Sequence, residues 1–140
     1  MKLRYLLDTN TLSFPFRDPD HPIVARLSET LEESAVPAPV WHELRYGVSR
    51  LPKGKKRDAL ESYVHEVVLA SYAILPYDQP AADWHGVERA RLERKGITVP
   101  FVDGQIASIA HVSDLVLVTH NPKDFKNFDG LSVQDWSKGR

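Results

Sequence analysis

The sequence predicts an α/β fold, a three-layer sandwich in which helices flank a mostly parallel central sheet. Two observations lead to this prediction. Short apolar segments of strand length alternate along the chain with longer segments whose apolar residues recur at helical spacing. The first expected strand, residues 3–7, carries apolar side chains on both faces, which is typical of a strand in a sheet covered on both sides.

The expected elements follow one another in a regular order. Strands are expected at residues 3–7, 35–40, 72–77, 115–121 and 131–133, of which 72–77 reads as a second buried strand. Helices are expected from Pro22 to about residue 31 and at residues 40–51, 58–71, 79–95 and 102–112, and residues 16–22 read as a loop. No repeat, low-complexity tract or linker interrupts this order, so we expect a single domain over residues 1–140.

The composition excludes several classes of protein. The chain contains no cysteine, which rules out disulfides, thiolate nucleophiles and cysteine-based zinc or iron–sulfur sites. Its net charge of −1 is not that of a basic nucleic-acid coat, so any nucleic-acid binding must use local basic patches. No stretch approaches the roughly 18 apolar residues of a spanning helix, and the N-terminus lacks the apolar region of a signal peptide. We therefore expect a soluble, cytoplasmic protein.

Two of the expected strands end in small polar residues. Residues 3–7 are followed by Asp8, Thr9 and Asn10, and residues 115–118 are followed by the segment 119–121, with Asp124 one turn further on. Sites in parallel α/β sheets form outside the carboxyl ends of the strands, and parallel strands bring these ends to one edge. The sequence therefore predicts that the two groups of polar residues meet there.

Two further acids stand out by their placement. Glu43 lies in the first turn of the helix expected at 40–51, with Gly47 leaving space one turn later. Asp103 begins the last long helix, on a stripe with Ala107 and Ala110. Carboxylates in a first helical turn also interact favourably with the helix dipole, and this alternative stays open for both.

A group of four carboxylates has an electrostatic cost. One like-charge pair at about 4 Å costs on the order of 4 kcal/mol at an effective dielectric constant of about 20. A hard divalent cation removes this cost, and ligands that are all oxygen favour Mg²⁺ or Mn²⁺ over zinc. Acids with such ions perform phosphodiester hydrolysis without a protein nucleophile. Asp8, Glu43, Asp103 and Asp124 are therefore our candidate metal ligands and catalytic residues.

Four segments together resemble the PIN-domain family in order and spacing, and more closely its VapC-type toxins. They are "LLDTN" at 6–10, "HELRYG" at 42–47, "PFVDGQIAS" at 100–108 and "LVLVTHNPKDF" at 115–125. The resemblance implies a Mg²⁺-dependent endoribonuclease that often acts on structured RNA such as tRNA. It also implies a homodimer that is inhibited by a cognate VapB-type antitoxin.

The resemblance assigns roles by position. Asp8, Glu43 and Asp103 match the family's acidic triad, and Asp124 matches a more variable fourth acid. Thr9 and Asn10 match the polar residues after the first acid, and we expect them to hydrogen-bond to Asp8 and orient it. Asn121 matches an asparagine often found after the last central strand, and His120 replaces the asparagine commonly seen at its position.

The densest basic cluster is a second candidate for function. It comprises Lys53, Lys55, Lys56 and Arg57. Contacts with an RNA backbone need only cationic density, but a solvated loop explains the same residues.

Two other functions compete with hydrolysis by a toxin. A catalytically silent PIN-fold module could bind RNA or protein, but it would tolerate neutral residues where this chain keeps its acids. A phosphatase or receiver of similar α/β layout would carry a second aspartate two residues after Asp8, where this chain has Asn10.

Overall fold

A sheet of five strands forms the centre of the computed structural model, which describes residues 2–138. The strands lie in the order β3-β2-β1-β4-β5, and every neighbouring pair is parallel. They are β1 (Tyr5–Leu7), β2 (Ser34–Pro37), β3 (Ala73–Leu75), β4 (Val116–Val118) and β5 (Val133–Gln134). The expectation of a mostly parallel sheet is confirmed.

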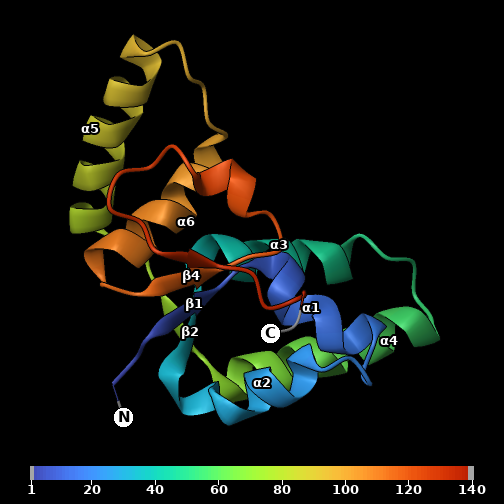
Figure 1. Cartoon of the computed structure of the whole chain (residues 1–140). Helices are drawn as coiled ribbons and strands as arrows, with labels where there is room; N and C mark the ends of the chain where they lie inside the picture. Colours follow the sequence, from blue (N-terminus) through green and yellow to red (C-terminus); the bar gives the residue numbers. More distant parts are fainter. Residues whose placement is uncertain (1, 139–140) are drawn as a thin grey trace.

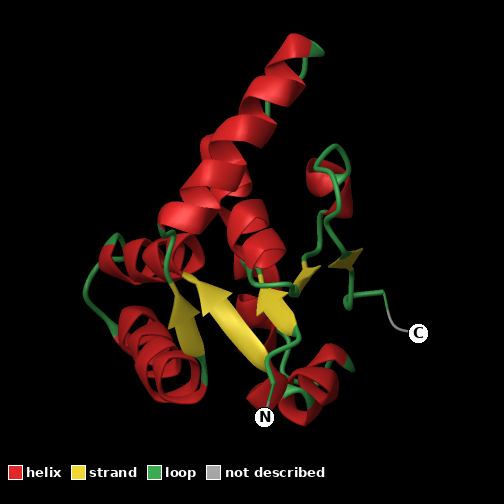
Figure 2. Cartoon of the chain, turned by 90° about the vertical axis from the view of Figure 1, so that its left-hand side faces the viewer, coloured by secondary structure: helices red, strands yellow, loops and turns green. Residues whose placement is uncertain are grey.

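Helices cover both faces of this sheet. They are α1 (Thr9–Arg17), α2 (Ile23–Glu29), α3 (Ala38–Ser49), α4 (Lys55–Ser62), α5 (Gln79–Arg94) and α6 (Phe101–Val112), with the short helices η1 (Leu31–Glu33), π-helical η2 (Tyr63–Leu69) and η3 (Pro122–Phe125). In Figure 1, α5 and α6 lie above the strands, and α2 and α4 lie below them. Figure 2 shows the sheet between its helical layers, which confirms the three-layer sandwich. Within the described part of the chain, no helix combines the length and the apolar character needed to cross a membrane.

Helix α1 was not expected from the sequence. Thr9, Asn10 and Thr11 have low helix propensity, and Pro15 removes a backbone donor from the helix interior. One local and one tertiary interaction outweigh these preferences: Asp8 caps the helix, and Leu12 is fully buried against the core.

Three other expectations are corrected by the structure. The strand at 72–77 was expected to be buried, but β3 lies at the edge of the sheet and Ala73 is exposed, since only β2 pairs with it. Helix α4 begins at Lys55 rather than 58. Helix α3 begins at Ala38, after the extended Pro37, so Glu43 lies in its second turn and not in its first.

The register of the two central strands positions the candidate site. Leu7 of β1 pairs with Val118 of β4, and both side chains are fully buried. The next residues along these strands, Asp8 and Thr119, therefore leave the sheet side by side at its carboxyl edge. The apolar strands thus fix where the polar residues meet.

A buried carboxylate attaches the segment after η3 to α5. Glu88 is only 5% exposed, and it accepts hydrogen bonds from Arg91 Nε (2.6 Å), Arg91 Nη2 (2.8 Å) and the backbone N–H of Asp129 (2.6 Å). Arg91 Nη2 also donates to the carbonyl of Asn127 (2.9 Å). The hydrogen bonds from Arg91 lower the pKa of Glu88 below its ordinary value. This network holds the chain just beyond Asp124.

We expect Glu88→Gln to lower the free energy of unfolding by about 2 kcal/mol, because hydrogen bonds to a buried charge are lost. Since the pKa of Glu88 is lowered on folding, its contribution is full above its ordinary value of 4.5 and is lost as the pH falls through the folded pKa. Urea unfolding between pH 3 and 7, as a rough range, measures both effects. Glu93→Gln, in an exposed pair with Arg89, is the control and should change stability little. Equal effects of the two substitutions would contradict this role.

Candidate active site

Asp8 is held at the end of β1 by both neighbouring elements. Its backbone N–H donates to the carbonyl of Val118 (3.0 Å), which continues the pairing of β1 with β4. Its Oδ1 accepts the backbone N–H of Thr9 (2.7 Å), so Asp8 is the N-cap of α1. Its Oδ2 accepts the hydroxyl of Thr119 (2.8 Å). The capping role and a functional role are therefore compatible, because each oxygen keeps a free lone pair.

Thr119 is a positioning residue that the sequence reasoning did not select. It is fully buried, and besides donating to Asp8 it accepts the backbone N–H of Asn121 (3.1 Å). The sequence indicates Thr119 only as the first polar residue after β4. Its contact with Asp8 depends on the register of β1 against β4, which the sequence does not show.

Asp103 and Asp124 lie on the α6 and η3 side of Asp8. Asp103 is half-buried in the first turn of α6, as expected, and Asp124 is exposed in η3. Both line a hollow of about 240 Å³ together with Lys123 and Asn127. Burial, followed by the negative charges of Asp124 and Asp8, raises the pKa of Asp103 to about 6. Two of the predicted acids, Asp124 and Asp8, therefore act electrostatically on a third, Asp103.

Glu43 lies in a separate hollow beside Thr9 and not beside the other three acids. It is exposed on α3 and lines a hollow of about 270 Å³ with Thr9, Ser13 and Arg50. Nothing lies within 4 Å of the position a side chain on Gly47 would take, so the predicted space beside Glu43 is present. Glu43 is thus connected to Asp8 through Thr9, while Asp103 and Asp124 occupy the neighbouring hollow.

The remaining predicted residues lie around the same edge. Thr9 contacts Asp8 through its backbone N–H, and Asn10 is exposed on the first turn of α1. Asn121 is exposed and its backbone is fixed by Thr119. His120 is half-buried beside Phe14, with 5.2 Å between the ring centroids, and burial lowers its pKa.

The chemistry of this edge suits a hard cation. All four acids offer oxygen ligands, and within residues 2–138 none of them forms an ion pair with a lysine, arginine or histidine. In the same part of the chain, no three acidic or histidine side chains lie close enough to enclose an ion. The oxygen donors are of the type that Mg²⁺ or Mn²⁺ prefers, and two of them, on Glu43 and Asp124, belong to exposed side chains.

The basic cluster lies beyond the far end of α3. Lys53, Lys55 and Lys56 are exposed in the α3–α4 connection and the start of α4, and Arg57 Nη1 donates weakly to the carbonyl of Leu51 (3.4 Å). Arg50 lies between this cluster and Glu43 along the chain, and its side chain lines the same hollow as Glu43. A basic path therefore leads from the connection toward the acids.

Comparison with known proteins identifies the family. The PIN domain family matches residues 5–131. The chain belongs to the PIN-domain family. It is 31% identical over 134 residues to the tRNA(fMet)-specific endonuclease VapC of Salmonella typhimurium (strain LT2), a match that covers 96% of this chain and 98% of that protein. It is 34% identical over 135 residues to Toxin FitB of Neisseria gonorrhoeae, covering 94% of this chain and 97% of FitB.

A solved structure agrees with these relatives. The chain matches the structure of DNA-bound VapBC from Salmonella typhimurium with a TM-score of 0.85 and 30% identity, covering 96% of this chain and 98% of that one. The fold class and the resemblance to VapC-type PIN domains are therefore confirmed.

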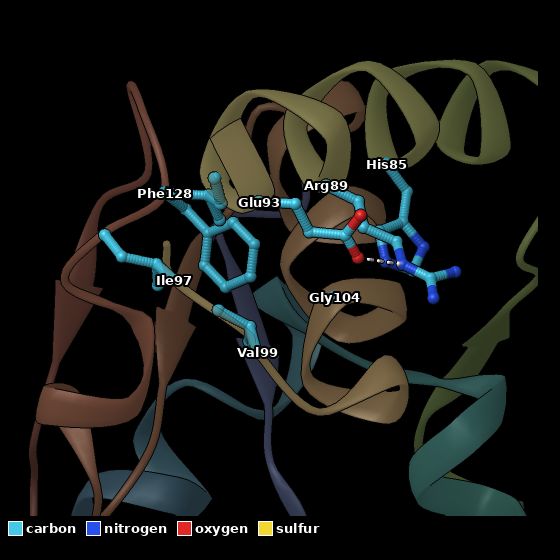
Figure 3. A pocket seen from close by; sticks show the side chains of 8 residues that line it. His85, Arg89, Glu93, Ile97, Val99, Gly104 and Phe128 are labelled. Carbon is cyan, nitrogen blue, oxygen red and sulfur yellow. Dashed lines mark hydrogen bonds and ion pairs between the residues drawn. The ribbon is translucent and has the colours of Figure 1, made fainter. Parts of the chain in front are cut away.

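One glycine of the PIN fold allows close packing beside Asp103. Figure 3 shows His85 reaching from α5 across Gly104 of α6, where a Cβ on Gly104 would lie 2.1 Å from His85 Nε2. His85 is only 4% exposed, and its Nδ1 shares a hydrogen bond with the hydroxyl of Tyr77 (2.8 Å). The cavity at this point measures only about 10 Å³, so it is a packing gap and not a ligand site. The contact fixes α6 next to its acid.

We expect Gly104→Ala to destabilise the protein despite the better helix propensity of alanine. The propensity gain is about 1 kcal/mol, whereas overpacking of a fixed core costs about 1–3 kcal/mol. Thermal unfolding of Gly104→Ala, His85→Ala and the double variant tests this. The double variant should be more stable than the sum of the single effects predicts, because the clash is gone. Strict additivity would contradict the proposed contact.

We expect Asp103 to lower the stability of the metal-free protein increasingly as the pH rises from about 4 to about 6. The folded pKa of Asp103 is raised from 3.8 to about 6, so ionisation in this range favours the unfolded state. Asp103→Asn removes this pH-dependent loss. The free energy of unfolding of the variant should therefore exceed that of the wild type, by an amount that grows toward pH 7. Denaturant unfolding in the presence of a chelator measures the difference. Parallel pH profiles of the two proteins would refute the repulsion.

Proposed function

We propose that this PIN-domain protein is a Mg²⁺-dependent endoribonuclease toxin that hydrolyses RNA phosphodiester bonds and is neutralised by a cognate VapB-type antitoxin. The observation that carries the proposal is the placement of Asp8, Asp103 and Asp124 around the carboxyl edge of the sheet. There burial and the charges of Asp124 and Asp8 raise the pKa of Asp103, and among the described residues none of the three acids has a cationic ion-pair partner. Glu43 completes the set from the adjoining hollow. Mn²⁺ suits the same oxygen ligands.

The relatives support the nuclease reading. The Salmonella protein is named a tRNA(fMet)-specific endonuclease, and the Neisseria protein is named a toxin. Transfer RNA is therefore the first substrate to test. Because such a substrate is cytoplasmic, we place the protein in the cytoplasm. The retained acids favour hydrolysis over a silent RNA- or protein-binding module.

Asp8 and Asp103 have distinct roles in this proposal. Thr119 and the N–H of Thr9 fix the orientation of Asp8, so this carboxylate is pre-organised before any ligand arrives. Asp103 takes up a proton near pH 6 in the metal-free protein, so acid opposes cation binding there. Once bound, the cation supplies Lewis-acid chemistry, activating water and neutralising charge on the phosphate. Asn10 and Asn121 are exposed near Asp8 and Thr119, where they can hydrogen-bond to that water or to the RNA.

The RNA backbone requires cations outside the acidic edge. We propose that Lys53, Lys55, Lys56 and Arg57 contact phosphates of the RNA, since the acids alone would repel the substrate. Arg50 extends this basic surface toward Glu43. The antitoxin partner follows from the similarity to VapBC, which is a complex. The homodimer implied by the family stays a prediction, as does a single domain over residues 1–140.

We expect Asp8→Asn to reduce Mg²⁺-dependent RNA cleavage by at least about 100-fold, the effect of removing one group that stabilises charge during reaction. Asparagine can still cap α1 and accept from Thr119, so the fold should persist. The assay is sequencing of RNA ends after incubation of tRNA with purified protein.

Asp20→Asn is the matched control, because Asp20 is exposed in the connection between α1 and α2. It should cleave like the wild type. Undiminished cleavage by a folded Asp8→Asn protein would disprove the proposed site.

A further inference from the structure

A row of aromatic and basic side chains begins beside Asp8 and follows one face of α1. Asn10, Phe14 and Arg17 are spaced at i, i+4 and i+7, so they share that face. His120, directly after Thr119, meets Phe14 edge to face with 5.2 Å between ring centroids. His21 meets the same ring at 4.5 Å from the connection after α1. We call Phe14, Arg17, His21 and His120 the Phe14 patch.

The Phe14 patch combines flat rings with a movable cation. Arg17 is exposed and its guanidinium lies 5.4 Å from the centroid of Phe14. One long hydrogen bond, from Arg17 Nη2 to the carbonyl of Asn10 (3.4 Å), fixes it there. Because a bond of this length is weak, Arg17 can turn to a phosphate at small cost and uncover one face of Phe14, while His21 and His120 keep their contacts with the ring.

His120 offers a ring in place of a charge. Burial, together with the charges of Arg17 and His21, lowers its pKa, whereas Asp135 and Asp8 act in the opposite direction. The net effect favours the neutral imidazole at pH 7, so His120 places an uncharged ring beside Phe14.

The opposite face of α1 has a different character. Phe16 lies there, 5.5 Å from the ring of Tyr63, near a mainly apolar hollow of about 210 Å³ that Pro15, Leu27 and Tyr63 help to line. Of the two faces of α1, the one that begins beside Asp8 combines aromatic rings with a cationic group. Proteins use this combination to hold single-stranded nucleic acid.

We propose that the Phe14 patch binds a nucleotide of the RNA next to the scissile phosphate. A base stacks on the face of the Phe14 ring that Arg17 uncovers, beside the edge-on ring of His120, and Arg17 contacts the adjoining phosphate. This inference rests on the proposed ribonuclease function and adds to it a defined subsite for an unpaired nucleotide. Stacking is tolerant of base identity, so the subsite holds the strand in place and does not read its sequence.

The test measures binding separately from hydrolysis. Every variant is made in the Asp8→Asn protein, and its affinity for a short fluorescein-labelled single-stranded RNA is measured by anisotropy at several salt concentrations. We expect Phe14→Leu to weaken binding about tenfold, because the leucine keeps the packing but not the stacking surface. Phe16→Leu is the matched control, and it should bind like the parent.

Arg17→Gln tests the phosphate contact on an exposed residue whose loss leaves the core intact. We expect the slope of log affinity against log salt to become shallower by about 0.7, the value for one phosphate contact to a single strand. Lys2→Gln, on an exposed residue before β1 at the amino end of the strands, should leave the slope unchanged. If Phe14→Leu does not fold, the salt dependence of Arg17→Gln still tests the subsite.

Equal RNA affinities of Phe14→Leu and Phe16→Leu, with an unchanged slope for Arg17→Gln, would overturn the subsite. A second result would also overturn it. If Phe14→Leu in the protein with Asp8 intact kept its KM for RNA but was no longer inhibited by the antitoxin, the patch would be a contact for the antitoxin and not for RNA. Failure of the proposed function has a different signature. The protein with Asp8 intact would not cleave, yet RNA binding would still depend on Phe14 and Arg17.

Discussion

The hydrogen bond from Thr119 to Asp8 is the constraint on which the rest of the site depends. It exists because β1 and β4 are parallel neighbours in a register that pairs Leu7 with Val118. The same carboxylate caps α1, so it sets the direction of the helix that carries Phe14 and Arg17. One buried hydroxyl therefore connects the sheet, the acidic edge and the proposed nucleotide subsite.

The acidic edge works against the stability of the protein without metal. Burial and the charges of Asp124 and Asp8 hold Asp103 in an unfavourable environment, and no described cation forms an ion pair with these acids. Proteins retain such repulsion where a ligand relieves it. The Glu88–Arg91 network and the contact of His85 with Gly104 provide rigidity on the α5–α6 side, so the acids stay together despite their repulsion.

The sequence predicted the sheet and the meeting of polar residues at its edge. Apolar strands followed by small polar residues are a local pattern, and parallel strands bring these residues to the same edge. The sequence did not predict α1, since Pro15 and the polar residues 9–11 argue locally for a turn and only packing of Leu12 and capping by Asp8 reverse this. Thr119 and Gly104 were missed for a related reason. Their roles depend on Asp8 and His85, partners about 110 and 20 residues away, which no local pattern reports.

The most direct test of the account is to locate the cation with Mn²⁺, whose unpaired electrons broaden the NMR signals of nearby nuclei. In a titration of uniformly ¹⁵N-labelled protein, the account predicts that the backbone signals of Thr9, Gly104 and Asn121 broaden first. Signals from the amino ends of the strands, such as Ser71 just before β3 at the edge of the sheet, should stay sharp. Broadening centred away from Asp8 and Asp103, or none at saturating Mn²⁺, would contradict the claim that the carboxyl edge of this sheet is a metal site.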